Sequence, residues 1–173
     1  MSSVCARLLL LGPLLLVAAT SDFPTQSRVG DRVLALNGEG VRTYSWLSIE
    51  IYRAALYLEA RDNDARRILA SPELKEIRIR YLQSGDRSIA ERAWDRAFQA
   101  NCACAMPAAF RARIANIAAG DEERYLFFPD RVLVSLNGRE PVVIPGISQT
   151  VLATFIGAHP PTEVLKRALL GGH

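Results

Sequence analysis

Apolar and polar side chains alternate most regularly in residues 76–81, where two isoleucines and Tyr81 share one face and Arg78 and Arg80 the other. This period of two predicts a strand with one buried and one solvated face. Asn37-Gly38 is typical of a turn after the first apolar run. Apolar runs predict further strands over residues 32–36, 47–59, 124–128, 131–136 and 141–144.

Helical spacing of apolar residues begins at residue 88 and predicts a helix to residue 100, with Trp94 on its apolar stripe and Asn101 at its end. Residues 62–64 can cap a short helix that ends near Ser71-Pro72. Residues 20–31 have the composition of a polar lead-in. Other helices are expected over residues 107–118, 148–156 and 161–170. This order predicts an α+β domain, a curved and largely antiparallel sheet with helices packed on one face.

The first nineteen residues have the pattern of a secretory signal. Arg7 precedes an apolar run over residues 8–18, and small residues follow at 18–19. A membrane anchor is the alternative, but the run is shorter than the ~20 apolar residues of a spanning helix. We therefore expect a signal peptide at 1–19, one domain at 20–173, a periplasmic or secreted location and no stable membrane span.

The charge balance excludes one class of partner. The chain carries 21 basic and 18 acidic side chains, and removal of residues 1–19 takes away one arginine and no acid. A nearly neutral mature chain argues against nucleic acid as a partner. We expect a monomer.

Cysteines and histidines give no sign of a metal site. Cys102 and Cys104 are two residues apart, which is poor spacing for a disulfide within a helix or tight turn. We expect two small packed residues there, with a local disulfide in an oxidising compartment as the alternative. The only histidines are His159 and His173. Gly38-Glu39-Gly40 lacks the third glycine of a dinucleotide fingerprint, so neither a metal nor a cofactor is expected.

Arg42 and Tyr52 are the strongest candidates for binding chemistry. A guanidinium offers a fixed fork of donors and stays protonated when it is desolvated. Strand parity groups Tyr52 with Ala54, Leu56 and Leu58, an apolar set that should face the helices. The two side chains could together seat a carboxylate or an enolate. The alternatives are a surface arginine on an edge strand and an ordinary strand aromatic.

Several stretches in order along the chain resemble the chalcone isomerase-like family, and they cover roughly residues 31–171. The resemblance is nearer to the exported bacterial members than to the plant enzymes. It implies an open-faced β-sandwich whose ligand lies in a cleft between the sheet and the helices. The stretches that carry it are Gly38-x-Gly40-x-Arg42, residues 51–59, Asn137-Gly138, Ile144-Pro145-Gly146, residues 151–157 and residues 165–171.

The resemblance also implies roles for single residues. Arg42 matches the arginine that contacts the negative part of the ligand, and Asn101 and Thr154 match active-site residues of the enzymes. Trp94 stands where the enzymes place a catalytic tyrosine, and an indole cannot relay a proton as a phenol can. Tyr52 replaces an enzyme threonine and is similar to the tyrosine of the fatty-acid-binding branch.

Three of these residues could instead have purely structural roles. Trp94 could be a core anchor, and Asn101 could end its helix. Thr154 could bond back to its own helix.

Three functions follow from these residues. The first is an exported protein that binds a small amphipathic anion such as a fatty acid, with contacts from Arg42, Tyr52, Trp94, Asn101 and Thr154. The second is an isomerase or intramolecular lyase acting on a chalcone-like enone, with Arg42, Asn101 and Thr154 as catalytic residues. The third is an envelope interaction module, which would gain weight if side chains filled the cleft.

Overall fold

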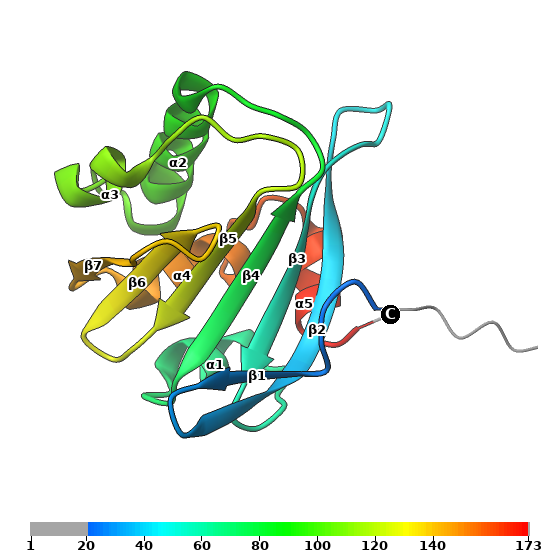
Figure 1. Ribbon diagram of the computed structural model, residues 1–173, viewed down its shortest axis with the longest axis vertical. Coiled ribbons are helices and arrows are strands. Elements are labelled where there is room, and N and C mark those ends of the chain that lie inside the picture. Colours follow the sequence, from blue (N-terminus) through cyan, green and yellow to red (C-terminus); the bar gives the residue numbers. More distant parts are fainter. Residues whose placement is uncertain (1–20, 173) are drawn as a thin grey trace, which may run out of the picture.

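The computed structural model describes residues 21–172, and the expected signal at 1–19 lies outside them. A single sheet of seven strands dominates the structure, and each strand pairs antiparallel with its neighbour in sequence (Figure 1). The expected α+β class and antiparallel sheet are confirmed. The strands are β1 (Gln26–Val29), β2 (Arg32–Tyr44), β3 (Ile49–Leu58), β4 (Lys75–Tyr81), β5 (Glu122–Phe127), β6 (Arg131–Leu136) and β7 (Val142–Pro145).

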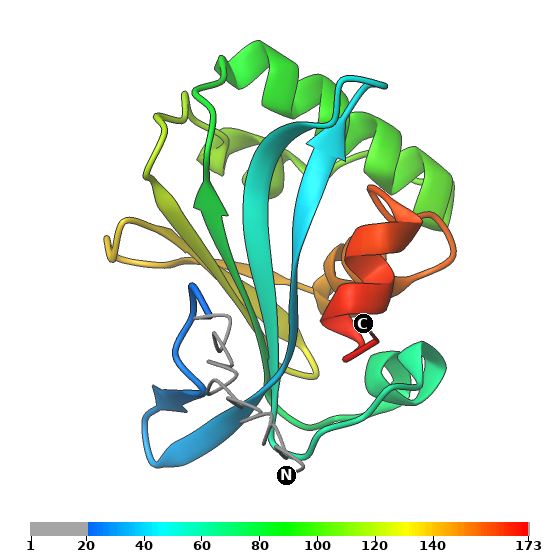
Figure 2. The same cartoon turned by 90° about the vertical axis from the view of Figure 1, so that its right-hand side faces the viewer.

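The helices lie on one side of the curved sheet (Figures 1 and 2). The main core between these layers contains Tyr52, Ala54, Leu56 and Leu58 from β3, so the predicted inward face of that strand is confirmed. No helix among residues 21–172 is long and apolar enough to cross a bilayer. The helices are α1 (Ala65–Ala70), α2 (Arg87–Cys102), α3 (Ala108–Arg113), α4 (Ser148–Ile156) and α5 (Glu163–Leu169).

The predicted turn at Asn37-Gly38 is wrong, because β2 continues through it with a shift in register. The Asn37 amide donates to the Leu169 carbonyl at 2.9 Å, which ties β2 to the end of α5. A Cβ at Gly38 would overlap the Ala168 carbonyl oxygen, and one at Gly40 would lie 2.6 Å from the Ala168 Cβ. Both glycines therefore allow α5 to approach the strand closely.

The segment expected to be a polar lead-in contains β1, which lies across the outer face of the sheet with the start of β2 (Figure 1). A second, smaller core lies beneath it, with Phe23, Leu34 and Tyr57 among its members. Glu76 is fully buried there, between Arg78 and Arg124. The expected solvated face at Arg78 is therefore wrong, because chain far away in sequence covers it. Arg80 is more exposed and pairs with Glu122.

Two further predictions fail near the end of α2. Helix α3 stops at Arg113 instead of residue 118. Cys102 and Cys104 form a disulfide, although we expected two packed thiols. Helix α2 ends at Cys102, and Ala103 adopts a left-handed conformation with φ of 52°. The two cysteines therefore lie on either side of a sharp change in backbone direction and do not both belong to the helix.

Candidate functional site

Arg42 and Tyr52 are register partners on β2 and β3. Cross-strand partners project from the same face of a sheet. The guanidinium carbon of Arg42 lies 5.5 Å from the centre of the Tyr52 ring, within the range of a cation–π contact. Tyr52 is only 5% exposed, whereas Arg42 is half-buried. Within residues 21–172, no carboxylate forms an ion pair with Arg42, so its charge remains available to a ligand.

The Tyr52 hydroxyl is held in its neutral form. Burial raises the pKa of Tyr52, and the positive charge of Arg42 opposes this rise without cancelling it. A neutral phenol is a hydrogen-bond donor. The Tyr81 ring packs edge-on against the Tyr52 ring, with 5.9 Å between centres, and limits its movement. The pair thus combines a charged fork of donors with a fixed neutral donor, which suits an incoming carboxylate.

A second polar cluster lies on the same inner face of the sheet, and the sequence analysis missed it. Glu123 accepts hydrogen bonds from Arg113, from the Tyr81 hydroxyl at 2.8 Å and from the Tyr125 hydroxyl at 2.7 Å. Arg113 also donates to the Tyr125 oxygen at 2.9 Å. We call these four residues the closed cluster, because the carboxylate has its partners within the protein.

The closed cluster is deeply buried. The side chains of Arg113 and Glu123 are 7% and 5% exposed. Burial and then the charge of Glu123 raise the pKa of Tyr81 well above its ordinary value. The pKa of Tyr125 is also raised well above the ordinary value, by burial first and with opposing effects of Arg113 and Glu123. Both phenols therefore stay neutral donors to the carboxylate.

Trp94 belongs to an aromatic group that packs between α2, α3, α4 and the sheet. Its ring centre lies 4.7 Å from that of Phe110, 6.0 Å from that of Phe155 and 6.1 Å from that of Tyr125. The Arg113 guanidinium lies over the Trp94 ring at 5.8 Å. Trp94 is half-buried and packs against the main core, in line with one of our two interpretations, and its contact with a ligand stays a prediction.

Asn101 and Thr154 direct their polar atoms at the backbone. The Asn101 amide donates to the carbonyls of Ala97 at 3.0 Å and His159 at 2.9 Å, and so fastens the end of α2 to a loop. The buried Thr154 hydroxyl donates to Val151 at 2.7 Å, one turn earlier in α4. Neither shares a hydrogen bond with Arg42 or Tyr52. The structure therefore pairs Arg42 with Tyr52 across two strands, and the ligand-binding and catalytic roles of Asn101 and Thr154 stay predictions.

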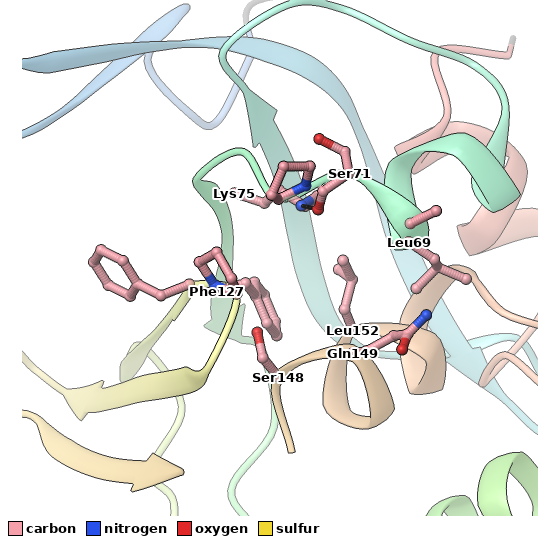
Figure 3. Close-up of a pocket in the computed structure, with 11 residues that line it drawn as sticks. Leu69, Ser71, Lys75, Phe127, Ser148, Gln149 and Leu152 are labelled. Atoms are coloured by element: carbon pink, nitrogen blue, oxygen red, sulfur yellow. Dashed lines mark hydrogen bonds between the residues drawn. The ribbon is translucent and has the colours of Figure 1, made fainter. Parts of the chain in front are cut away.

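Two pockets among the described residues lie at the end of the sheet opposite to Arg42 and Tyr52. One, of about 200 Å³, lies between α1, the start of β4 and α4, where Lys75, Ser148 and Leu152 line it (Figure 3). The other, of about 260 Å³, lies on the far side of the same Lys75 segment. Neither pocket is lined by Arg42 or Tyr52, so neither is a ligand cleft formed by these two residues.

Lys75 has a structural role between these pockets. Its ammonium donates to the carbonyls of Ser71 at 2.6 Å and Glu73 at 2.8 Å, which fixes the segment after α1. Burial lowers the pKa of Lys75. No group of three His, Cys, Asp or Glu side chains within residues 21–172 is placed to hold a metal ion.

Comparison with known proteins agrees with this fold. The model of the chalcone isomerase-like family matches residues 17–171. The chain belongs to the chalcone isomerase-like family. A crystal structure of a fatty-acid binding protein from Arabidopsis thaliana is similar, with a TM-score of 0.63 and 16% identity over 86% of this chain and 90% of that chain. At this identity the likeness shows the shared fold alone. No curated protein gives a significant match.

Proposed function

We propose that this chalcone isomerase-like protein binds a small amphipathic anion, such as a fatty acid, after export from the cytoplasm. The observation that carries the proposal is the position of Arg42, without an ion-pair partner in the described chain, over the buried Tyr52 ring. The ligand carboxylate accepts from the guanidinium and from the Tyr52 hydroxyl. Export rests on the basic start, apolar run and small residues of the first nineteen positions.

The apolar tail is proposed to lie beside Tyr52, where half-buried apolar side chains border the main core. The half-buried Tyr81 ring contacts the Tyr52 ring on the sheet, and the half-buried Ala90 and Trp94 of α2 pack against the same core. A ten-carbon tail gives a gross gain of about 8 kcal/mol at ~0.8 kcal/mol per methylene, and association entropy offsets much of it. Affinity in the micromolar range is the expected result.

The comparisons support the proposal at the level of family and fold. A protein with the same fold is described as a fatty-acid binding protein, and Tyr52 resembles that branch more than the enzymes. The isomerase alternative has less geometric support, because the side-chain atoms of Asn101 and Thr154 already bond to backbone carbonyls. Turnover of chalcones that disappears in Arg42→Ala would favour the enzyme instead.

The proposal is tested by calorimetric titration with decanoate. Arg42→Ala removes a charge-assisted contact of ~1.5–3 kcal/mol and should weaken binding roughly 10- to 100-fold. Tyr52→Phe removes a neutral donor and should weaken binding by about threefold to tenfold. Arg139→Ala is the matched control, because Arg139 is exposed in the turn between β6 and β7, three strands away from β3. Equal affinity of the wild type, Arg42→Ala and Arg139→Ala proteins would reject the anion seat.

A further inference from the structure

The hairpin between β2 and β3 ends in a group of large exposed apolar side chains. Trp46 is 89% exposed, Tyr44 64%, Leu47 59% and Ile49 42%. We call these four residues the apolar tip. The hairpin projects at the same end of the sheet as α2, as Figures 1 and 2 show. Four such side chains so close together form an exposed apolar patch, which usually marks a surface that binds a partner.

The local backbone places these side chains outward. The Ser48 amide donates to the Ser45 carbonyl at 3.1 Å, so Trp46 and Leu47 occupy the two corners of a turn. Ser45 and Ser48 both have positive φ, 62° and 51°. Turn corners are usually occupied by glycine, proline, asparagine, aspartate or serine. Folding gains almost nothing from a tryptophan that stays exposed at such a corner, so the stability of the fold does not account for it.

We propose that the apolar tip inserts into the surface of a lipid bilayer. Tryptophan and tyrosine are enriched at the membrane–water interface, where the ring is buried and the polar group stays hydrated. The tip is a narrow convex turn, and such a shape penetrates between lipid head groups more readily than it matches a flat protein surface. Leu47 and Ile49 supply aliphatic surface for the acyl region.

One basic side chain beside the tip has no carboxylate partner in the described chain. Arg42 lies two residues before Tyr44 on β2 and has no ion-pair partner in the described chain, so its charge is free to meet an anionic head group. The nearby acidic residue, Glu50, lies 3.8 Å from Arg53, whose guanidinium also pairs more closely with Asp22. Basic residues near a membrane surface are attracted to anionic lipids.

Docking by the tip would bring the anion seat close to the bilayer. Two residues of strand span roughly 7 Å, which places Arg42 at the depth of the head groups when Tyr44 lies at the interface. An amphipathic anion could then pass between bilayer and protein without crossing much water. This consequence rests on the proposed function, whereas docking itself does not.

Flotation with vesicles tests the docking. The probe is the secreted mature chain with vesicles of phosphatidylcholine, alone or with a minority of phosphatidylglycerol. Wild type is expected to float with the vesicles, more strongly when phosphatidylglycerol is present. Trp46→Ser combined with Leu47→Ser should lower partitioning by at least about tenfold, because both side chains lose apolar burial. Val143→Ser is the matched control, since Val143 is 54% exposed on β7.

Tryptophan fluorescence gives a local readout. The chain has two tryptophans, so Trp94→Phe leaves Trp46 as the reporter, whose emission should shift to the blue with vesicles. Flotation of the unmodified protein decides the question if Trp94→Phe does not fold. Absence of the wild type from the vesicle fraction overturns the proposal, and so does an equal loss in Val143→Ser.

Different variants test ligand binding by the anion seat and membrane docking by the apolar tip, so one proposal can be rejected without the other. The tip double variant should bind decanoate in vesicle-free buffer within about twofold of wild type. Tyr52→Phe, which changes the buried part of the anion seat and no residue of the tip, should dock on vesicles like wild type.

Discussion

Two arginine–tyrosine groups on one face of the sheet differ in burial and in whether the arginine has a carboxylate partner. In the closed cluster, Arg113 meets Glu123 and Tyr125 within the protein. Arg42 lies over Tyr52 without a carboxylate from any described residue. A buried cation with its own counter-charge is a structural element, whereas a half-buried cation without one can accept a ligand. We therefore expect the carboxylate partner to distinguish the structural arginine, Arg113, from the proposed ligand-binding arginine, Arg42.

The largest expected difference between the two groups is in stability. Arg113→Met leaves the Glu123 carboxylate buried without its cation and should lower the free energy of unfolding by about 3–5 kcal/mol. Arg42→Met breaks no ion pair in the described chain and should change it by no more than about 0.5 kcal/mol. Denaturant titration of both variants measures the difference. Equal losses would mean that Arg42 is also a structural residue.

A smaller effect should separate the tyrosines. Tyr125→Phe removes a hydroxyl that donates to Glu123 at 2.7 Å and should cost about 1.5–3 kcal/mol of stability, the range for hydrogen bonds to charged groups. Tyr52→Phe should cost less than about 1 kcal/mol, because we assign its hydroxyl to ligand binding. Thermal unfolding of the two variants compares them. A larger loss for Tyr52→Phe would contradict the division into closed and open groups.

The smallest expected effect on stability is seen only at alkaline pH, where buried tyrosines lose their protons. Burial raises the pKa of Tyr57 to about 12, and the pKa values of Tyr81 and Tyr125 are also raised. Unfolded tyrosine titrates near ~10, so the stability from these phenols is fully present below that pH and is lost as pH rises through the folded values. Melting temperature should be flat near neutrality and fall above about pH 10, less steeply in Tyr57→Phe. An unchanged slope in that variant would exclude Tyr57 as a contributor.

The local sequence pattern was sufficient to predict most of the sheet and part of the candidate site. The parity of β3 and the buried isoleucine face of β4 depend on near neighbours, and both were predicted correctly. The opposite face of β4 was expected to be solvated but is covered at Glu76 and Arg78. The Arg42–Tyr52 pair was found because both residues lie in one hairpin.

Features built from distant segments were not predictable in this way. Strand β1 covers Glu76, and Ser27 of β1 donates a hydrogen bond to the Glu76 carboxylate, although the two residues are 49 positions apart in sequence. The closed cluster joins Arg113, in a helix that ends earlier than expected, to Glu123, which lay outside the predicted strand. Asn37-Gly38 has the composition of a turn, but close packing of α5 decides its conformation.

The central claim is that Arg42 holds the carboxylate of a bound ligand, and carbon-13 NMR of decanoate labelled at its carboxyl carbon tests it most directly. A guanidinium at hydrogen-bonding distance lowers the pKa of a carboxyl group. The account predicts that the bound carboxyl group titrates at lower pH than free decanoate, and that Arg42→Ala shifts its pKa upward while Arg139→Ala leaves it unchanged. A bound carboxyl group with the same pKa in wild type and Arg42→Ala would contradict the account.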